Sequence, residues 1–187
     1  MPNYLNNLTI VAENAAEAQK SWARLGFALL PGGVIALGST IIVLRDAAEP
    51  TPAFGPLSLT MTEQPNPDAG AAAPHPNGAR ALAAVVKTME NPADHAEVLG
   101  RAANQREMRA TSAGVELKLA NARLEALTPA AFAQRYGDGE QALVFATSSL
   151  KAVRAFFNAA GLVFEEKSDR LVLAERAAGL ILAFEAP

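Results

Sequence analysis

The order of hydrophobic and polar positions at the N-terminal end predicts a strand followed by a helix. Residues 5–11 end in a β-branched run, which is typical of a strand. Asn14 can cap a helix. One face of that helix would carry Ala15, Ala18, Trp22 and Leu25. Further strands are predicted at 34–37, 40–44 and 57–62. The first unit of the chain therefore has the order β-α-β-β-β.

The same order recurs in the middle of the chain. Residues 81–87 predict a strand, and Asn91-Pro92 predicts the start of a helix that runs to about residue 103. The strands expected next cover 106–111, 114–120 and 123–127. Thr128-Pro129 then begins an extra short helix that ends near Gly137.

The C-terminal end carries the clearest copy of the unit. A strand at 141–147 precedes a helix that Ser148 or Ser149 caps. The buried stripe of this helix consists of Leu150, Val153, Phe157 and Ala160. Strands are expected at 163–165, 171–174 and 180–184. Because one unit recurs along the whole chain, the repeat determines the expected architecture.

We divide the chain into three units and one linker. The units cover 1–63, 79–138 with the extra helix, and 139–187, and residues 64–78 form a Pro-rich linker. One unit cannot bury both faces of its own small sheet, so units must pair. We expect the second and third units to pair within the chain. The first unit is expected to pair with its counterpart in a second chain, giving a two-fold homodimer, or to be partly covered by the extra helix.

Composition narrows the possible partners. Half of the 187 residues are hydrophobic, which is enough for a sizeable core. The net charge of −3 offers no basic surplus for nucleic acid or for an anionic membrane surface. The chain has no cysteine, so disulfides and thiolate chemistry are excluded. The N-terminus does not match a signal peptide and no apolar stretch is long enough to span a membrane, so we expect a cytoplasmic protein.

Three short strings connect the repeat to a known superfamily. They are Arg24-Leu25-Gly26-Phe27 at the first helix end, the string from Pro74 to Ala79, and the closing string from Gly179 to Phe184. With the βαβββ repeat, they resemble the vicinal oxygen chelate superfamily of glyoxalase I, bleomycin-resistance proteins and extradiol dioxygenases. This resemblance implies an α/β (α+β) fold of βαβββ modules, with curved, barrel-like mixed sheets and helices outside.

The resemblance also implies positions for a divalent metal, which members bind through His and Glu on inner strands. The first-strand His position falls at Asn7, Ala84 and Ala142 in the three units. The last-strand Glu position falls at Leu59 and Ala183 in the first and third units. Only the Asn7 carbonyl among these side chains is even a weak ligand. We therefore expect no metal site and no cofactor.

Several polar residues are candidates for binding a ligand. Asn7, Thr9, Thr60 and Thr62 lie on predicted strands of the first unit and can line one concave face. Two more candidates, His75 and Asn77, lie in the linker string. A histidine titrates near neutrality, so His75 is a weak candidate for acid–base catalysis, but a turn or capping role that fixes the linker is the preferred explanation. Asn77-Gly78 is a turn signature first and a ligand contact second.

Three carboxylates and one histidine complete the candidate chemistry. Glu116, Glu125 and Glu185 lie on or at the end of predicted strands, where a buried carboxylate can act as a general base. Alternation alone does not determine which of them face the interior. His95 lies on the second predicted helix and is expected to be solvated.

These observations favour a glyoxalase-like protein without a metal, which holds a small, mostly apolar molecule in the concave face. Sequestration of this kind resembles that by bleomycin-resistance proteins. One alternative is a lyase or isomerase of the same superfamily that uses His75 or an inward carboxylate. Another is a structural or partner-binding module, because fold alone does not decide function.

Overall fold

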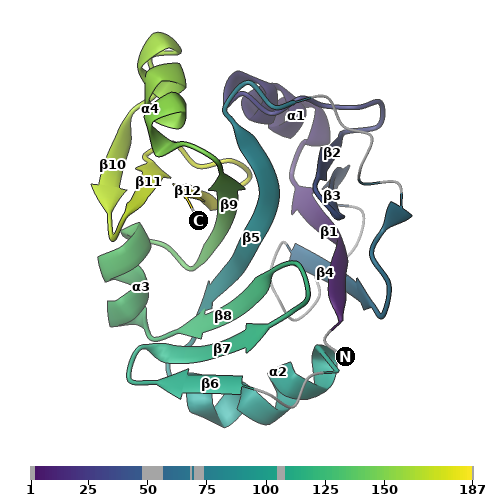
Figure 1. Cartoon of the computed structure of the whole chain (residues 1–187), viewed down its shortest axis with the longest axis vertical. Helices are drawn as coiled ribbons and strands as arrows, with labels where there is room; N and C mark the ends of the chain where they lie inside the picture. The colour runs from purple at the N-terminus through teal and green to yellow at the C-terminus, as the bar shows by residue number, and fades with distance from the viewer. Residues whose placement is uncertain (1–2, 48–56, 68, 70–73, 105–107, 187) are drawn as a thin grey trace.

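The chain folds into two separate mixed sheets, one of four strands and one of eight (Figure 1). The computed structural model describes residues 3–47, 57–67, 69, 74–104 and 108–186. None of the helices in these ranges is long and apolar enough to cross a membrane. Two open sheets with helices packed on them confirm the expected mixed α/β class, and neither sheet closes into a barrel within the described ranges.

The first unit forms the four-stranded sheet. Its elements are β1 (Tyr4–Ala12), α1 (Ala15–Arg24), β2 (Val34–Leu37), β3 (Thr40–Asp46) and β4 (Leu57–Thr62). As the sequence predicts, the Asn14 side chain accepts a hydrogen bond from the Glu17 backbone at 3.0 Å and caps α1. Trp22 and Leu25 on the buried side of the helix are fully enclosed.

The second and third units share the eight-stranded sheet. Its strands are β5 (Ala79–Thr88), β6 (Met108–Thr111), β7 (Gly114–Lys118), β8 (Arg123–Leu127), β9 (Gln141–Thr147), β10 (Phe164–Lys167), β11 (Arg170–Leu173) and β12 (Ile181–Glu185). Their order is β10-β11-β12-β9-β5-β8-β7-β6. The first strands of the two units, β5 and β9, meet antiparallel at the centre, where Ala84 lies opposite Val144.

The first sheet is paired differently from either half of the larger one. In both halves of the eight-stranded sheet, the last strand of the unit runs parallel beside the first. In the first unit β3 takes that place, and β4 lies antiparallel on the other side of β1. The βαβββ order therefore holds, but β4 occupies the position relative to β1 that β9 occupies relative to β5.

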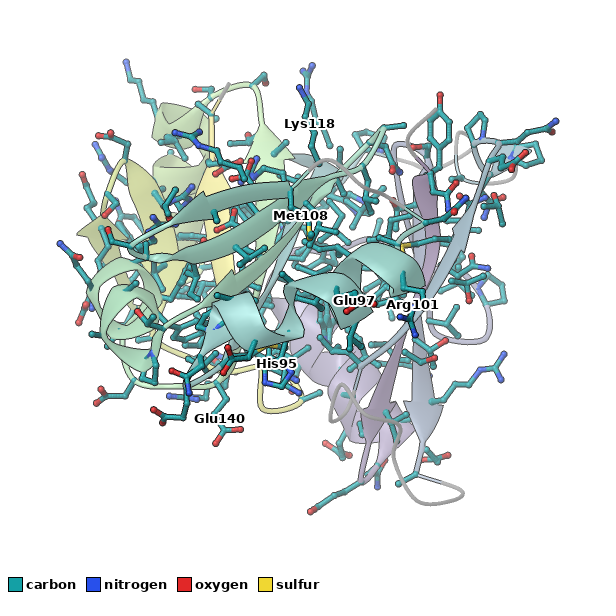
Figure 2. All side chains as sticks on the ribbon, turned by 90° about the horizontal axis from the view of Figure 1, so that it is seen from below. His95, Glu97, Arg101, Met108, Lys118 and Glu140 are labelled. Carbon is teal, nitrogen blue, oxygen red and sulfur yellow. The ribbon has the colours of Figure 1, made fainter. Side chains whose placement is uncertain are left out.

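The two sheets share one core. Trp22 and Phe27 of the first unit pack together with ring centroids 4.9 Å apart, and Phe27 lies 4.8 Å from Phe145 of β9. Helix α4 (Leu150–Ala159) adds Phe157, whose ring contacts Phe184 of β12. The helix that follows β5 consists of the 3₁₀ turn η2 (Pro92–His95) and α2 (Ala96–Ala102). On the outside of α2, Glu97 and Arg101 form an exposed ion pair (Figure 2).

Candidate ligand site on the concave sheet face

The eight-stranded sheet curves around one helix, α3 (Pro129–Tyr136), while α4 and the first unit lie on its other side (Figure 1). We call the face that α3 covers the concave face. Its apolar cluster comprises Ala84, Val86, Leu127, Ala142, Val144, Val172, Ile181 and Ala183, together with Phe132 and Tyr136 of α3. Thr128 caps α3 by accepting a hydrogen bond from the Ala131 backbone at 3.3 Å. The extra helix thus fills the centre of the curved sheet with two aromatic rings.

A network of ion pairs lies beside this cluster. Glu125 on β8 is 6% exposed, and it accepts hydrogen bonds from Arg123 Nε at 3.1 Å and from Arg135 Nη1 of α3 at 3.3 Å. Glu185 on β12 accepts from Arg123 at 3.0 Å and from Arg170 Nε at 2.9 Å. Arg123 therefore bridges two carboxylates that are 60 positions apart in the chain. Burial acts to lower the pKa of Arg123, but the adjacent Glu185 and Glu125 outweigh it and raise that pKa.

Tyr136 lies at the junction between the aromatic filling and the ion pairs. Burial and the nearby Glu125 raise the pKa of Tyr136 to about 12, against the opposing effect of Arg170 and Arg135. The guanidinium carbon of Arg170 lies 5.7 Å from the centre of the ring, within the range of a cation–π contact. Within the described residues, the buried hydroxyl of Tyr136 has no hydrogen-bond partner.

An open hollow of about 480 Å³ lies over the rest of this region. Small side chains line much of it, namely Ala81, Ala83, Ala120, Ala122, Ala146 and Ala186. Charged walls come from Glu116, Lys118, Arg123 and Glu185. Lys118 and Arg123 are register partners on β7 and β8, as are Glu116 and Glu125. Lys118 points away from α2 (Figure 2). The hollow thus combines apolar small residues with charged groups, as ligand sites commonly do.

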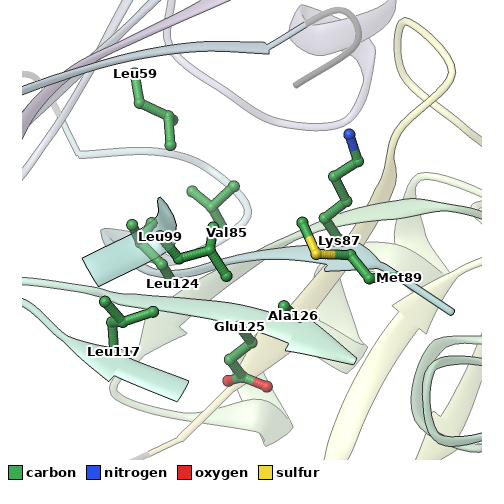
Figure 3. Close-up of a pocket in the computed structure, with 9 residues that line it drawn as sticks. All are labelled: Leu59, Val85, Lys87, Met89, Leu99, Leu117, Leu124, Glu125 and Ala126. Atoms are coloured by element: carbon green, nitrogen blue, oxygen red, sulfur yellow. The ribbon is translucent and has the colours of Figure 1, made fainter. Parts of the chain in front are cut away.

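A second cavity between the two sheets is too small for a ligand. Its free volume is about 10 Å³, close to the space of a single water molecule. Leu59, Val85 and Leu99 line it, and the carboxylate of Glu125 points away from them (Figure 3). This cavity belongs to the packing of the core.

His75 and Asn77, two residues singled out from the sequence, fasten the linker to the first unit. His75 Nδ1 accepts a hydrogen bond from the Ala28 backbone at 2.9 Å, so its Nε2 carries the proton that faces the Ala36 carbonyl at 2.9 Å. Burial lowers the pKa of His75, although the bond to Ala36 opposes the shift. Asn77 donates to the Leu25 carbonyl at 2.9 Å and accepts from the Ala79 backbone at 3.0 Å. Both side chains lie away from the hollow and are satisfied by backbone groups.

Gly26 explains why the linker can come so close to the end of α1. Its φ of +84° favours glycine, and a Cβ there would lie 2.9 Å from Asn77 Cβ and 2.5 Å from Phe156. The Asn77 backbone donates to the Gly26 carbonyl at 3.2 Å. The close approach of Asn77 and Phe156 thus explains why the Leu-Gly-Phe string has glycine at its centre.

The first-unit candidates lie on a different surface. Asn7 is the register partner of Thr60, and Thr9 that of Ser58, so these side chains share one face of the four-stranded sheet. Asn7 Oδ1 accepts a hydrogen bond from Asn66 at 3.3 Å. Thr62 donates to the Gln64 carbonyl at 2.7 Å. Asn7, Thr9 and Thr60 thus form a polar row of their own, separate from the hollow and from His75.

Comparison with known proteins relates the fold to solved structures. No protein-family model matches the sequence, and no curated protein matches it. A 2,2',3-trihydroxybiphenyl 1,2-dioxygenase from Sphingomonas wittichii strain RW1 is similar with a TM-score of 0.51 at 10% identity, over 100% of this chain and 91% of that chain. A xylose isomerase-like TIM barrel/4-hydroxyphenylpyruvate dioxygenase fusion protein is similar with a TM-score of 0.53 at 11% identity, over 100% of this chain and 50% of that chain. The chain has a vicinal oxygen chelate fold. At such low identity the likeness concerns the fold alone.

The vicinal oxygen chelate fold implies a metal on the concave face, and the residues present there do not fit one. Ala84, Ala142 and Ala183, which stand at the expected ligand positions, are all on this face and are fully buried. A methyl group supplies no donor to a metal. In the part of the chain that the structure describes, no group of three or more His, Cys, Asp or Glu side chains can hold a metal ion.

Within this vicinal oxygen chelate fold, sequence reasoning left the ion-pair network undecided. The sequence indicates Glu125 and Glu185 as carboxylates on strands, but it does not indicate their three arginine partners. The available signal was the i, i+2 pair Arg123 and Glu125, which places both side chains on one face of a strand. Arg135 and Arg170 come from elements distant in sequence, so only the tertiary fold brings them to the same carboxylates.

Proposed function

We infer that this protein binds a small, mostly apolar molecule in the hollow of the concave face, without a metal. The observation that carries this inference is the hollow itself, about 480 Å³ over a surface of alanines beside Arg123 and Glu185. Small-molecule sites are concave, between about 300 and 1,000 Å³, and mainly apolar with a few placed polar groups. The alanines keep this part of the face open, whereas Phe132 and Tyr136 fill the adjacent part.

A binding role is favoured over a lyase or isomerase role by the state of the carboxylates. Glu125 and Glu185 each accept hydrogen bonds from two arginines. These bonds occupy the carboxylate oxygens that would have to accept a proton from a substrate. His75, the other acid–base candidate, has both ring nitrogens engaged by backbone groups. Glu185 therefore belongs to the wall of the hollow, Glu125 to the ion pairs beside it, and His75 to the attachment of the linker.

Thermal shift measurements with a blocked variant test the proposal. A panel of small aromatic and carbonyl compounds is screened against the wild type, because a ligand that binds only the native state raises its melting temperature. Ala146→Leu places a larger side chain into the hollow, and Ala155→Leu makes the same change on the exposed side of α4. We expect hits that shift the wild type and Ala155→Leu but not Ala146→Leu.

Two outcomes contradict the proposal. The first is a broad panel that produces no shift in the wild type, or hits that shift Ala146→Leu as strongly. The second is metal analysis of the purified protein that finds stoichiometric zinc, nickel, manganese or iron.

A further inference from the structure

We propose that the ligand of this hollow is an uncharged aromatic molecule with a carbonyl-type oxygen, which accepts a hydrogen bond from Arg123 while the ring lies on the alanines. This inference rests on the proposed function and adds the chemical class of the ligand. Three features of the lining carry it, namely the balance of its charged groups, the donors of Arg123 and the floor of methyl groups.

The charged side chains around the hollow cancel one another. Glu116 and Glu185 contribute two negative charges, and Lys118 and Arg123 contribute two positive ones. Arg123 is bound to Glu185, and Lys118 has an interaction partner of its own. An ion of either sign would lose hydration in the hollow without meeting a net opposite charge, and burying a charge that is not compensated is costly. The lining therefore favours an uncharged ligand.

The hydrogen-bonding capacity of Arg123 exceeds what its two carboxylate partners use. A guanidinium has five N–H donors on three nitrogens. The bonds to Glu125 and Glu185 use Nε and Nη2, and Nη1 has no partner among the described residues. The side chain lines the hollow and is 28% exposed. A carbonyl oxygen accepts a hydrogen bond without bringing a charge, so it suits Nη1 in a hollow that is already balanced.

The uncharged polar side chain in the lining is engaged elsewhere. Asn121 accepts a hydrogen bond from the Leu5 backbone at 2.8 Å, and its amide nitrogen donates to the Leu5 carbonyl at 3.0 Å and to Ser39 Oγ at 2.8 Å. Asn121 thus holds the first unit against the larger sheet. Arg123 is the better donor for an oxygen of the ligand.

The floor of the hollow suits a planar ring. Ala81 of β5 and Ala146 of β9 are register partners, and both line the hollow together with Ala83. Neighbouring methyl groups form a low, even surface, which a flat ring can contact over its whole face. Dispersion contacts are weak singly and add up over such an area.

Four aromatic probes of similar size separate charge from hydrogen bonding. They are acetophenone, ethylbenzene, which lacks the oxygen, benzoate and benzylammonium, and binding to the ¹⁵N-labelled full chain is followed by NMR titration. We expect acetophenone to bind roughly three- to tenfold more tightly than ethylbenzene and roughly tenfold or more tightly than either ion. It should shift the backbone signals of Ala81 and Ala146, and it alone should shift the side-chain N–H signals of Arg123.

A substitution at Arg123 tests the hydrogen bond. Arg123→Lys keeps the positive charge but replaces the planar fork of donors with a single ammonium group. Acetophenone should then bind no more tightly than ethylbenzene. Arg154→Lys on the exposed side of α4 is the matched control and should keep the wild-type preference. If Arg123→Lys does not fold, the side-chain signals of Arg123 in the wild type test the same bond.

Two further variants test the balance of charge. Glu116→Gln leaves one positive charge in excess around the hollow, and Lys118→Gln leaves one negative charge in excess. At low salt, benzoate should bind Glu116→Gln about two- to fivefold more tightly than it binds the wild type, and benzylammonium should gain similarly with Lys118→Gln. Affinities of the ions that do not respond to either variant would contradict the role of the balance.

The outcomes distinguish this inference from the proposed function. An ion that binds the wild type at the alanines as tightly as acetophenone, or ethylbenzene that does so, would overturn the ligand class and leave the binding function standing. The same holds if none of the four probes binds while the broader thermal shift panel gives hits in the hollow. If the probes and the panel both fail, the inference and the proposed function are overturned together.

Discussion

The side-chain nitrogen of Asn77 lies 2.9 Å from the carbonyl oxygen of Leu25 and joins the end of the linker to the end of α1. The same asparagine accepts a hydrogen bond from the Ala79 backbone where β5 begins. One fully buried amide thus connects the helix of the first unit to the central strand of the larger sheet. The segment from Pro74 to Ala79 therefore joins the two sheets through the hydrogen bonds of this side chain.

Asn77→Ala should destabilise the protein strongly. It removes two buried hydrogen bonds and leaves the Leu25 carbonyl without its side-chain donor, so we expect a loss of about 2–4 kcal/mol in the free energy of unfolding. Urea denaturation measures this loss. Asn158→Ala on the exposed side of α4 is the control, with an expected change within about 0.5 kcal/mol. Equal effects of the two substitutions would contradict a stabilising role of the Asn77 side chain at the junction of the two sheets.

His75 should make stability depend on pH. Protonation of Nδ1 replaces an acceptor with a donor against the Ala28 N–H, and burial already lowers the pKa of His75. The unfolded chain therefore takes up a proton below about pH 6.5, where the folded chain does not. Stability contributed by the neutral ring is present above that pH and is lost as the pH falls towards the lower folded-state pKa.

Denaturation curves at several pH values test this dependence. His75→Gln should be less stable at neutral pH by about 1–3 kcal/mol, and should lose less stability than the wild type between about pH 7.5 and 5.5. The exposed His95 provides the control, since His95→Gln should change the free energy of unfolding at neutral pH by at most about 0.5 kcal/mol. A His75→Gln profile that runs parallel to the wild type would rule out this role.

Tyr136→Phe should cost little stability or none. The hydroxyl is buried and has no partner among the described residues, so its removal is expected to change the free energy of unfolding by between about 0 and +1 kcal/mol. Ultraviolet titration should show one tyrosine of the wild type ionising near a pKa of about 12, and the variant should lack it. A loss of more than about 1 kcal/mol would indicate a bound partner for the hydroxyl.

Glu125→Gln should lower the free energy of unfolding more than a matched substitution at the surface does. The buried carboxylate accepts from Arg123 and Arg135, so we expect a loss of about 1–3 kcal/mol in unfolding free energy. Glu166 pairs with Arg154 in an exposed position, and Glu166→Gln should cost at most about 0.5–1 kcal/mol. Thermal and urea denaturation of both variants provide the comparison. A smaller effect at Glu125 than at Glu166 would show that the buried network does not stabilise the fold.

Much of the fold follows from local signals in the sequence. Asn14, Thr128 and Ser149 cap their helices as expected, since a cap depends only on residues within one turn. Ala84, Ala142 and Ala183, which stand at the positions of metal ligands, also lie on the concave face. The resemblance to the superfamily predicts this location, because it assigns each ligand position to a particular residue on an inner strand. The order of strands along the chain could also be predicted, because each strand is indicated by its own alternation of hydrophobic and polar residues.

The undetermined features depend on contacts that are distant in sequence. Alternation could not assign the faces of β5, because its register with β9 shifts between Ala79 and Ala81 and again between Leu82 and Ala84. The sequence predicts the extra helix, but the position of this helix inside the curved sheet depends on packing against strands of the third unit. Likewise, Arg170 reaches Glu185 through the β11–β12 pairing, which no single segment encodes.

The placement of β4 has a consequence for assembly. This strand hydrogen-bonds along the side of β1 that faces outward from β3, so the lateral backbone groups of β1 are already engaged within one molecule. A homodimer that joins the β1 strands of two chains would therefore have to release both copies of β4, by reciprocal exchange of that strand between the molecules. Without such an exchange, a second copy that extends this sheet must add at one of its edge strands, β2 or β4.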